Sequence, residues 1–217
     1  MKNVLLLFVL SALLLGAAGP KPPPVSISRI SAAVYAQAEK RAATGKKAAE
    51  KITHPVRKKN GCLVIPTATG NKVFRDKVIA NNEVGDVTYE YQGFSAALQQ
   101  HCIQVQYYES SEWLIVEQNG NIIHLFSPPD YSPNRALILT GSQGLVYSMM
   151  PNGMQLFRKT NGKMTLLWEL RPATWEPAEF FWVSDALIYL KQERCTPEGE
   201  TYSPRRFTYA QLVIKKE

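Results

Sequence analysis

Residues 113–170 decide the fold, and they read WLIVEQNGNIIHLFSPPDYSPNRALILTGSQGLVYSMMPNGMQLFRKTNGKMTLLWEL. Short apolar runs alternate with turn signals in this stretch, and three of the turns carry Asn-Gly, at residues 119–120, 152–153 and 161–162. Asn-Gly favours tight hairpins, because both central positions of a type I′ turn need a positive φ. The pattern therefore predicts an antiparallel β meander.

The same signals continue on both sides of this stretch. Residues 86–91 and 101–108 alternate apolar and polar side chains, which is the period of half-buried strands. We predict one all-β domain over residues 61–217, built as an antiparallel meander of about 10–12 short strands. The segment SPPDYSPN at residues 127–134 interrupts it. Because proline donates no hydrogen bond to a ladder, we expect a loop there.

The first 19 residues have the three parts of a secretory signal peptide. Lys2 supplies the positive charge, residues 4–15 form an apolar run, and small residues follow at positions 16–19. A bilayer-spanning helix needs roughly 20 apolar residues, so a retained anchor is the less favoured alternative. The segment predicts that the chain is exported, to the periplasm or outside the cell.

Residues 20–60 form a basic arm rich in Pro, Ala and Lys. They contain ten Lys or Arg and two Glu, whereas residues 61–217 contain fourteen Lys or Arg and sixteen Asp or Glu. The formal charge of +7 therefore lies outside the predicted domain, which argues against nucleic-acid binding. We expect the arm to be disordered or partly helical. Charge runs are usually solvated, so a tether is the simpler interpretation and weak contact with an anionic surface is the alternative.

Three cysteines, Cys62, Cys102 and Cys195, would meet an oxidising compartment in an exported protein. One disulfide is then expected, with its pairing open, and three unpaired, partly buried thiols are the alternative. No two cysteines are closely spaced and the three His are scattered, so we expect no metal site. No cofactor-binding motif occurs, and we expect no cofactor.

The motif YSPNRALIL at residues 131–139 resembles the strand entry in blades of WD40-like and TolB-type β-propellers. Its Ala-Leu-Ile triplet at 136–138 recurs at 186–188, but Asn-Arg at 134–135 replaces the Asp-Gly of such blades. The resemblance is limited to this short motif and implies a binding platform. Blades of roughly 40–50 residues would leave the ring incomplete. An incomplete, propeller-like meander and a two-layer sandwich therefore both remain open.

The sequence contains no recognisable catalytic motif. We therefore expect a non-enzymatic binding or interaction module for an unknown protein or glycan ligand. Aromatic side chains in or beside loops are the candidate binding residues, because exposed rings stack on sugars and on peptides. These candidates are Tyr131, Trp175, Trp182 and Tyr202.

Two other functions remain open. A secreted hydrolase of glycan or cell-wall polymer would need two carboxylates in one cleft, and Glu109, Glu112 and Asp185 are its candidates. A secreted enzyme inhibitor would present the SPPDYSPN loop. The neighbours His101 and Cys102 do not form a nucleophilic pair, because adjacent strand residues point to opposite faces.

Overall fold

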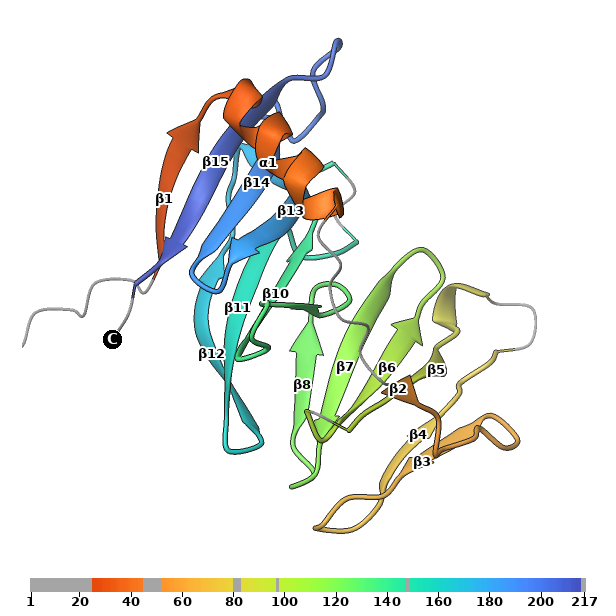
Figure 1. Cartoon of the computed structure of the whole chain (residues 1–217). Coiled ribbons are helices and arrows are strands. Elements are labelled where there is room, and N and C mark those ends of the chain that lie inside the picture. The colour runs from red at the N-terminus through yellow and green to blue at the C-terminus, as the bar shows by residue number, and fades with distance from the viewer. Residues whose placement is uncertain (1–24, 45–51, 80–82, 97, 147–148, 216–217) are drawn as a thin grey trace, which may run out of the picture.

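The computed structural model describes residues 25–44, 52–79, 83–96, 98–146 and 149–215 (Figure 1). The predicted signal peptide at residues 1–19 lies outside them. Antiparallel strands dominate the described chain, which confirms the prediction of an all-β antiparallel fold. The remaining elements are helix α1 (Ala32–Thr44) and the 3-10 turn η1 (Glu83–Gly85). No helix in the described ranges is long and apolar enough to cross a membrane.

The strands form three larger sheets and one hairpin, which we name the first sheet (β1-β15-β14-β13), the middle sheet (β12-β11-β10-β9), the third sheet (β2-β5-β6-β7-β8) and the β3–β4 hairpin. Most neighbouring strands are also consecutive in sequence, as in a meander. The strand bounds are β1 Val25–Ile30, β2 Ile52–Thr53, β3 Cys62–Ile65, β4 Lys72–Arg75, β5 Thr88–Ser95, β6 Gln100–Gln106, β7 Ser111–Glu117, β8 Ile122–Leu125, β9 Asp130–Tyr131, β10 Leu137–Ser142, β11 Gly153–Thr160, β12 Lys163–Leu170, β13 Trp175–Ser184, β14 Leu187–Arg194 and β15 Phe207–Ile214.

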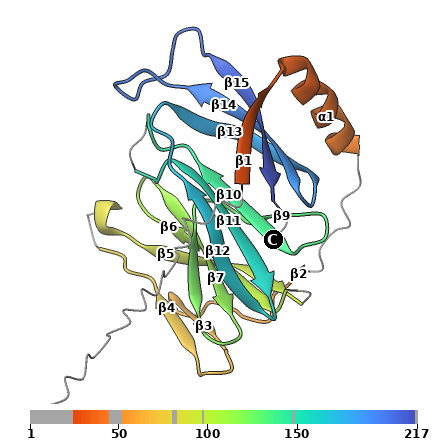
Figure 2. The same ribbon diagram turned by 90° about the vertical axis from the view of Figure 1, so that its left-hand side faces the viewer.

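These layers stack on one another, and a separate hydrophobic core fills each interface (Figure 2). The first and middle sheets enclose Leu190 and Leu156, among others. The middle and third sheets enclose Phe157 and Ile115. The third sheet and the β3–β4 hairpin enclose a core made of Leu63, Ile65, Phe74, Ile103, Val105, Leu114 and Val116. The structure therefore has more layers than the two-layer sandwich that was one sequence-based alternative.

The middle sheet contributes side chains to two cores at once. In β10, Leu137 and Leu139 pack against the first sheet, while Ile138 packs against the third sheet. This is the alternation expected of a strand covered on both faces. In β11 the adjacent residues Leu156 and Phe157 likewise face the two cores, and the register shift at this point leaves Leu167 of β12 as the extra residue of a bulge. The middle sheet thus holds the other layers in place.

Part of the predicted arm belongs to the β structure, which corrects the proposed separation at residue 61. Strand β1 pairs with β15 along its whole length, from Val25 opposite Ile214 to Ile30 opposite Tyr209. Helix α1 follows and buries Tyr35, whose ring lies 5.3 Å from the Phe181 ring. The Val25-Ser26-Ile27-Ser28 alternation was the available signal for this strand, but it is short and follows a proline-rich segment, and most of its side chains are exposed.

Two of the Asn-Gly turns close hairpins, but they use different geometry. Asn161 and Gly162 both have positive φ, 51° and 77°, as the type I′ turn requires. At the β7–β8 turn only Gly120 has a positive φ, 83°, and the chain makes a longer connection in which the Glu117 N–H donates to the Asn121 carbonyl. The hairpin predicted at 119–120 is therefore confirmed, whereas its predicted turn type is wrong.

The resemblance to propeller blades does not extend to the architecture. No sheet in the described part of the chain closes on itself, and the layers form an open stack, so a propeller-like fold is not supported. The motif that suggested it lies at β9, where Asp130 and Tyr131 pair with Leu139 and Ile138. This corrects the expectation that no ladder strand forms within residues 127–134. A two-residue edge strand fits between the prolines.

Glu117 ties the third sheet to the middle sheet. It ends β7 with no exposed surface, and its Oε1 accepts the backbone N–H of Met164 in β12 at 2.5 Å. Its Oε2 accepts a hydrogen bond from the Asn121 side-chain amide at 3.2 Å. A buried carboxylate needs such donors, because burying an unpaired charge is costly.

Replacing Glu117 with Ala should destabilise the protein by about 3 kcal/mol, because the Met164 N–H loses its partner inside the core. Urea unfolding of the chain from residue 20 onward, which retains every described element, measures this change. The control is Glu112→Ala on the same strand, whose partly exposed contacts should cost less than about 1 kcal/mol. Equal losses in the two variants would contradict the assigned role of Glu117.

Candidate ligand-binding pocket

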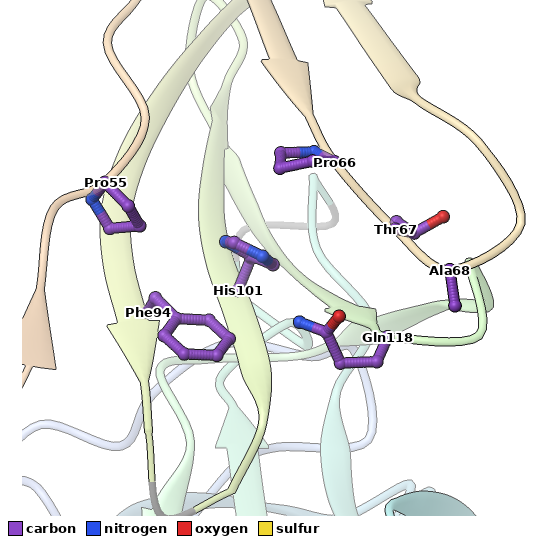
Figure 3. A pocket seen from close by; sticks show the side chains of 7 residues that line it. All are labelled: Pro55, Pro66, Thr67, Ala68, Phe94, His101 and Gln118. Atoms are coloured by element: carbon purple, nitrogen blue, oxygen red, sulfur yellow. The ribbon is translucent and has the colours of Figure 1, made fainter.

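An open pocket of about 420 Å³ lies where the β3–β4 hairpin meets the third sheet (Figure 3). In Figure 3, Pro55 and Phe94 lie on one side of His101, and the turn that follows β3 lies on the other. The lining residues come from five separate segments, and they are Pro55, Pro66, Thr67, Ala68, Phe94, His101 and Gln118. A ligand would therefore meet proline and aromatic rings together with a few polar groups.

Two turns form one wall of the pocket. The Ala68 N–H donates to the Gln118 carbonyl at 2.7 Å, and the Thr69 hydroxyl donates to the Asn119 carbonyl at 2.9 Å. Gly120 permits this approach, since a Cβ at that position would lie 2.4 Å from Thr69 Oγ1. Its positive φ also disfavours other residues. The contact fixes Ala68 and Gln118 at the rim.

The opposite wall depends on Gly93, at a bulge in β5. A Cβ on Gly93 would lie 2.2 Å from Ile52 Cγ2, and its φ is 124°. Glycine therefore allows β2 to pair closely with β5, and the chain that follows β2 brings Pro55 near Phe94 (Figure 3). The bulge lies next to a binding surface, as bulges in sheets often do.

His101 is the buried polar group of the pocket, with 3% of its surface exposed. Its Nδ1 lies 2.8 Å from the Tyr91 hydroxyl, and its ring lies 4.6 Å from the Phe94 ring. Burial lowers the pKa of His101 and raises the pKa of Tyr91 to about 12. At neutral pH the pair is therefore an uncharged imidazole beside an uncharged phenol, and the imidazole is the member of the pair that lines the pocket.

His101 and Cys102 point to opposite sides of the third sheet, as the sequence predicts. His101 faces the pocket, and Cys102 packs against the core shared with the middle sheet. The structure forms no disulfide among Cys62, Cys102 and Cys195. Among the described residues, no group of three His, Cys, Asp or Glu is placed to hold a metal ion.

The aromatic residues predicted to bind a ligand do not converge. Trp182 is buried in the core between the first and middle sheets, where its Nε1 donates to the Asp130 carbonyl at 3.2 Å. Trp175 packs against the same core from the other end of β13, roughly 23 Å away at the usual rise per residue. Tyr131 packs against the neighbouring core, and the Tyr202 ring lies 4.4 Å from the Arg206 guanidinium.

The carboxylates considered for hydrolysis are also dispersed. Glu112 accepts the Tyr107 hydroxyl at 2.5 Å and lies 3.0 Å from His124 Nδ1, on the rim of the third sheet. Asp185 accepts the Asn134 N–H at 2.7 Å, near the far end of β13. Glu109 is exposed in the loop before β7. These acids do not line one cleft.

A pair of acids that the sequence did not suggest lies beside Trp175. Glu176 and Glu193 are directly opposite in the β13–β14 ladder, and both are buried. The Glu176 Oε1 accepts the N–H groups of Leu145 and Val146, at 2.6 and 3.2 Å, and Arg205 lies 3.3 Å from Glu193. Glu176 therefore anchors the loop at Leu145, whereas the Glu193 Oε1 forms an ion pair with the exposed Arg205 and no hydrogen bond.

Comparisons with protein-family models, with curated proteins and with solved structures find no match for this chain. The candidate site therefore rests on the geometry of the pocket. Sequence reasoning considered His101 only as a partner of Cys102. The period of two places it on the same strand face as Ile103 and Val105, and this was the available signal that it is buried.

The lowered pKa of His101 predicts how stability depends on pH. The fold disfavours the protonated imidazole, so as pH falls below the ordinary value of 6.5 the unfolded chain takes up the proton first. The unfolding free energy should therefore decrease with falling pH, by at most about 1.4 kcal/mol per pH unit for this one proton, until pH falls below the folded pKa.

Urea unfolding between pH 7.5 and 5.0 measures the effect, with His101→Phe as the matched variant. His54 and His124 are common to both proteins, so their contributions cancel in the difference. In the variant, the unfolding free energy should decrease less steeply with falling pH, because the contribution of His101 is absent. A wild-type imidazole that titrates at or above 6.5 in an NMR titration would show that the assigned burial is wrong.

Proposed function

We propose that this chain is an exported, non-enzymatic binding module that holds a small neutral ligand in the pocket around His101. The observation that carries the proposal is the pocket itself, at about 420 Å³. Small-molecule sites usually span roughly 300–1,000 Å³ and combine apolar walls with a few polar groups. Export rests on the signal peptide predicted for residues 1–19.

The lining favours a ligand with a ring and at least one hydrogen-bonding group. Phe94 and two prolines offer flat apolar surfaces, which suit an aromatic ring or the apolar face of a sugar. The imidazole of His101 and the amide of Gln118 supply the polar contacts. A glycan unit or a small aromatic compound would fit these groups.

The chemistry of the lining favours binding over catalysis. The seven lining residues include one titratable group, His101, and no acid or thiol. A nucleophile or general base needs a second group within hydrogen-bond reach that activates it. Tyr91 orients His101 but stays protonated well above neutral pH. The hydrolase alternative gains no support from Glu176 and Glu193, since both are buried and neither lines the pocket.

Blocking the pocket tests this proposal. Ala68 is exposed at the rim, and Ala68→Trp would place a large ring across the opening. Neutral ring compounds are screened against the chain from residue 20 onward. A compound at ten times its Kd should stabilise the wild type by about 1.4 kcal/mol. The same compounds should not stabilise the variant.

Ala173→Trp is the control, because Ala173 is exposed in the loop between β12 and β13. It adds the same ring far from the pocket and should leave binding unchanged. The proposal fails if no compound stabilises the wild type, or if Ala68→Trp binds the same compounds with equal affinity.

A further inference from the structure

The outer face of the β3–β4 hairpin combines exposed valines with cations. Val64 and Val73 are directly paired across the hairpin and are 40% and 57% exposed. In the next row Cys62 pairs with Arg75, and Lys59 bridges to Cys62 from the preceding segment. We call Lys59, Val64, Val73 and Arg75 the hairpin face. It points away from the core that the inner side chains of the hairpin fill.

The hairpin face lies at one end of the stack, and helix α1 covers the other end (Figures 1 and 2). Layers in the middle of the stack bury both faces, whereas no described helix or strand covers the outer side of the hairpin. The pocket lies on the inner side, between the hairpin and the third sheet. A contact made by the hairpin face is therefore separate from the proposed ligand site.

Positive charge is concentrated in the segment of sequence that contains the hairpin. Residues 52–79 contain six Lys or Arg and one acid, a net charge of +5. Residues 80–217 contain eleven Lys or Arg and fifteen Asp or Glu, a net charge of −4. The single acid, Asp76, pairs with one of these cations, since it lies 2.5 Å from Lys58 Nζ, and it also accepts the Tyr89 N–H at 3.0 Å. The cations of this segment are Arg57, Lys58, Lys59, Lys72, Arg75 and Lys77.

We propose that the hairpin face docks on an anionic lipid surface. Lys59 and Arg75 would lie among anionic headgroups, which attract each basic side chain held near the surface. Val64 and Val73 would enter the boundary between headgroups and acyl chains, where exposed aliphatic groups leave water.

The composition of the face favours lipid over other occupants. A soluble polyanion would neutralise the cations but would gain nothing from the two valines. A second copy docked face to face would bring like charges together, which disfavours that contact. A lipid surface uses both properties of the face at once.

Vesicle co-sedimentation tests the proposal with the chain from residue 20 onward, so that the apolar leader does not contribute. Vesicles of phosphatidylcholine alone are compared with equal mixtures of phosphatidylcholine and phosphatidylglycerol. The wild type should bind the anionic vesicles at least about tenfold more tightly, and added salt should weaken this binding. Lys59→Glu with Arg75→Glu should remove most of the preference.

Matched variants at the far end of the molecule serve as controls. Arg29→Glu with Lys215→Glu reverses two exposed cations near β1 and β15, and Val213→Glu changes an exposed valine of β15. Both controls should bind anionic vesicles like the wild type, whereas Val73→Glu should bind at least about tenfold more weakly. Each variant is first checked by urea unfolding, and Val73→Ser replaces Val73→Glu if the latter does not fold.

Three results would overturn the proposal. The first is no preference of the wild type for anionic vesicles. The second is an equal loss in the hairpin and control variants, which would mean that overall charge and not this face decides binding. The third is unchanged vesicle binding by Val73→Glu or its Ser replacement, which would make the face a general polyanion site.

Discussion

Adjacent residues of β10 fill two different cores. Leu137 and Leu139 pack on the first sheet and Ile138 packs on the third sheet, so the middle sheet fixes the position of both neighbours. Glu117 strengthens one of these interfaces with a hydrogen bond to the backbone of β12. The other layers are placed relative to the middle sheet. The first and third sheets cover its two faces, and the β3–β4 hairpin covers the outer face of the third sheet.

The candidate pocket is a consequence of how the last layer attaches. The β3–β4 hairpin covers the third sheet with its apolar side chains, and its turn closes on the β7–β8 turn at Gly120. Side-chain packing fills the centre of that interface but not its end, where His101 and Phe94 remain accessible to the pocket. The interface between the hairpin and the third sheet therefore contributes a buried core at its centre and the pocket at its edge. The outer side of the same hairpin exposes Val64 and Val73.

Local patterns predict the strands of this protein better than they predict its site. Alternation and Asn-Gly turns identified the strands on either side of 161–162, because these signals act between neighbouring residues. Strand β1 was missed, since its pairing with β15 depends on residues at the other end of the chain. Trp182 was a candidate binding residue because it stands on a strand beside a turn, and the strand register directs it into a core. The residues that line the pocket come from five separate segments, so no local sequence pattern predicts it.

The central claim is that the space around His101 receives a ligand. An NMR-monitored titration of the isotope-labelled chain with neutral ring compounds tests it most directly. The account predicts that bound compounds shift the side-chain signals of Phe94, His101 and Gln118 together, and leave those of Trp175 and Tyr202 unchanged. Compounds that bind only near Trp175 and Tyr202, or no bound compound at all, would contradict it.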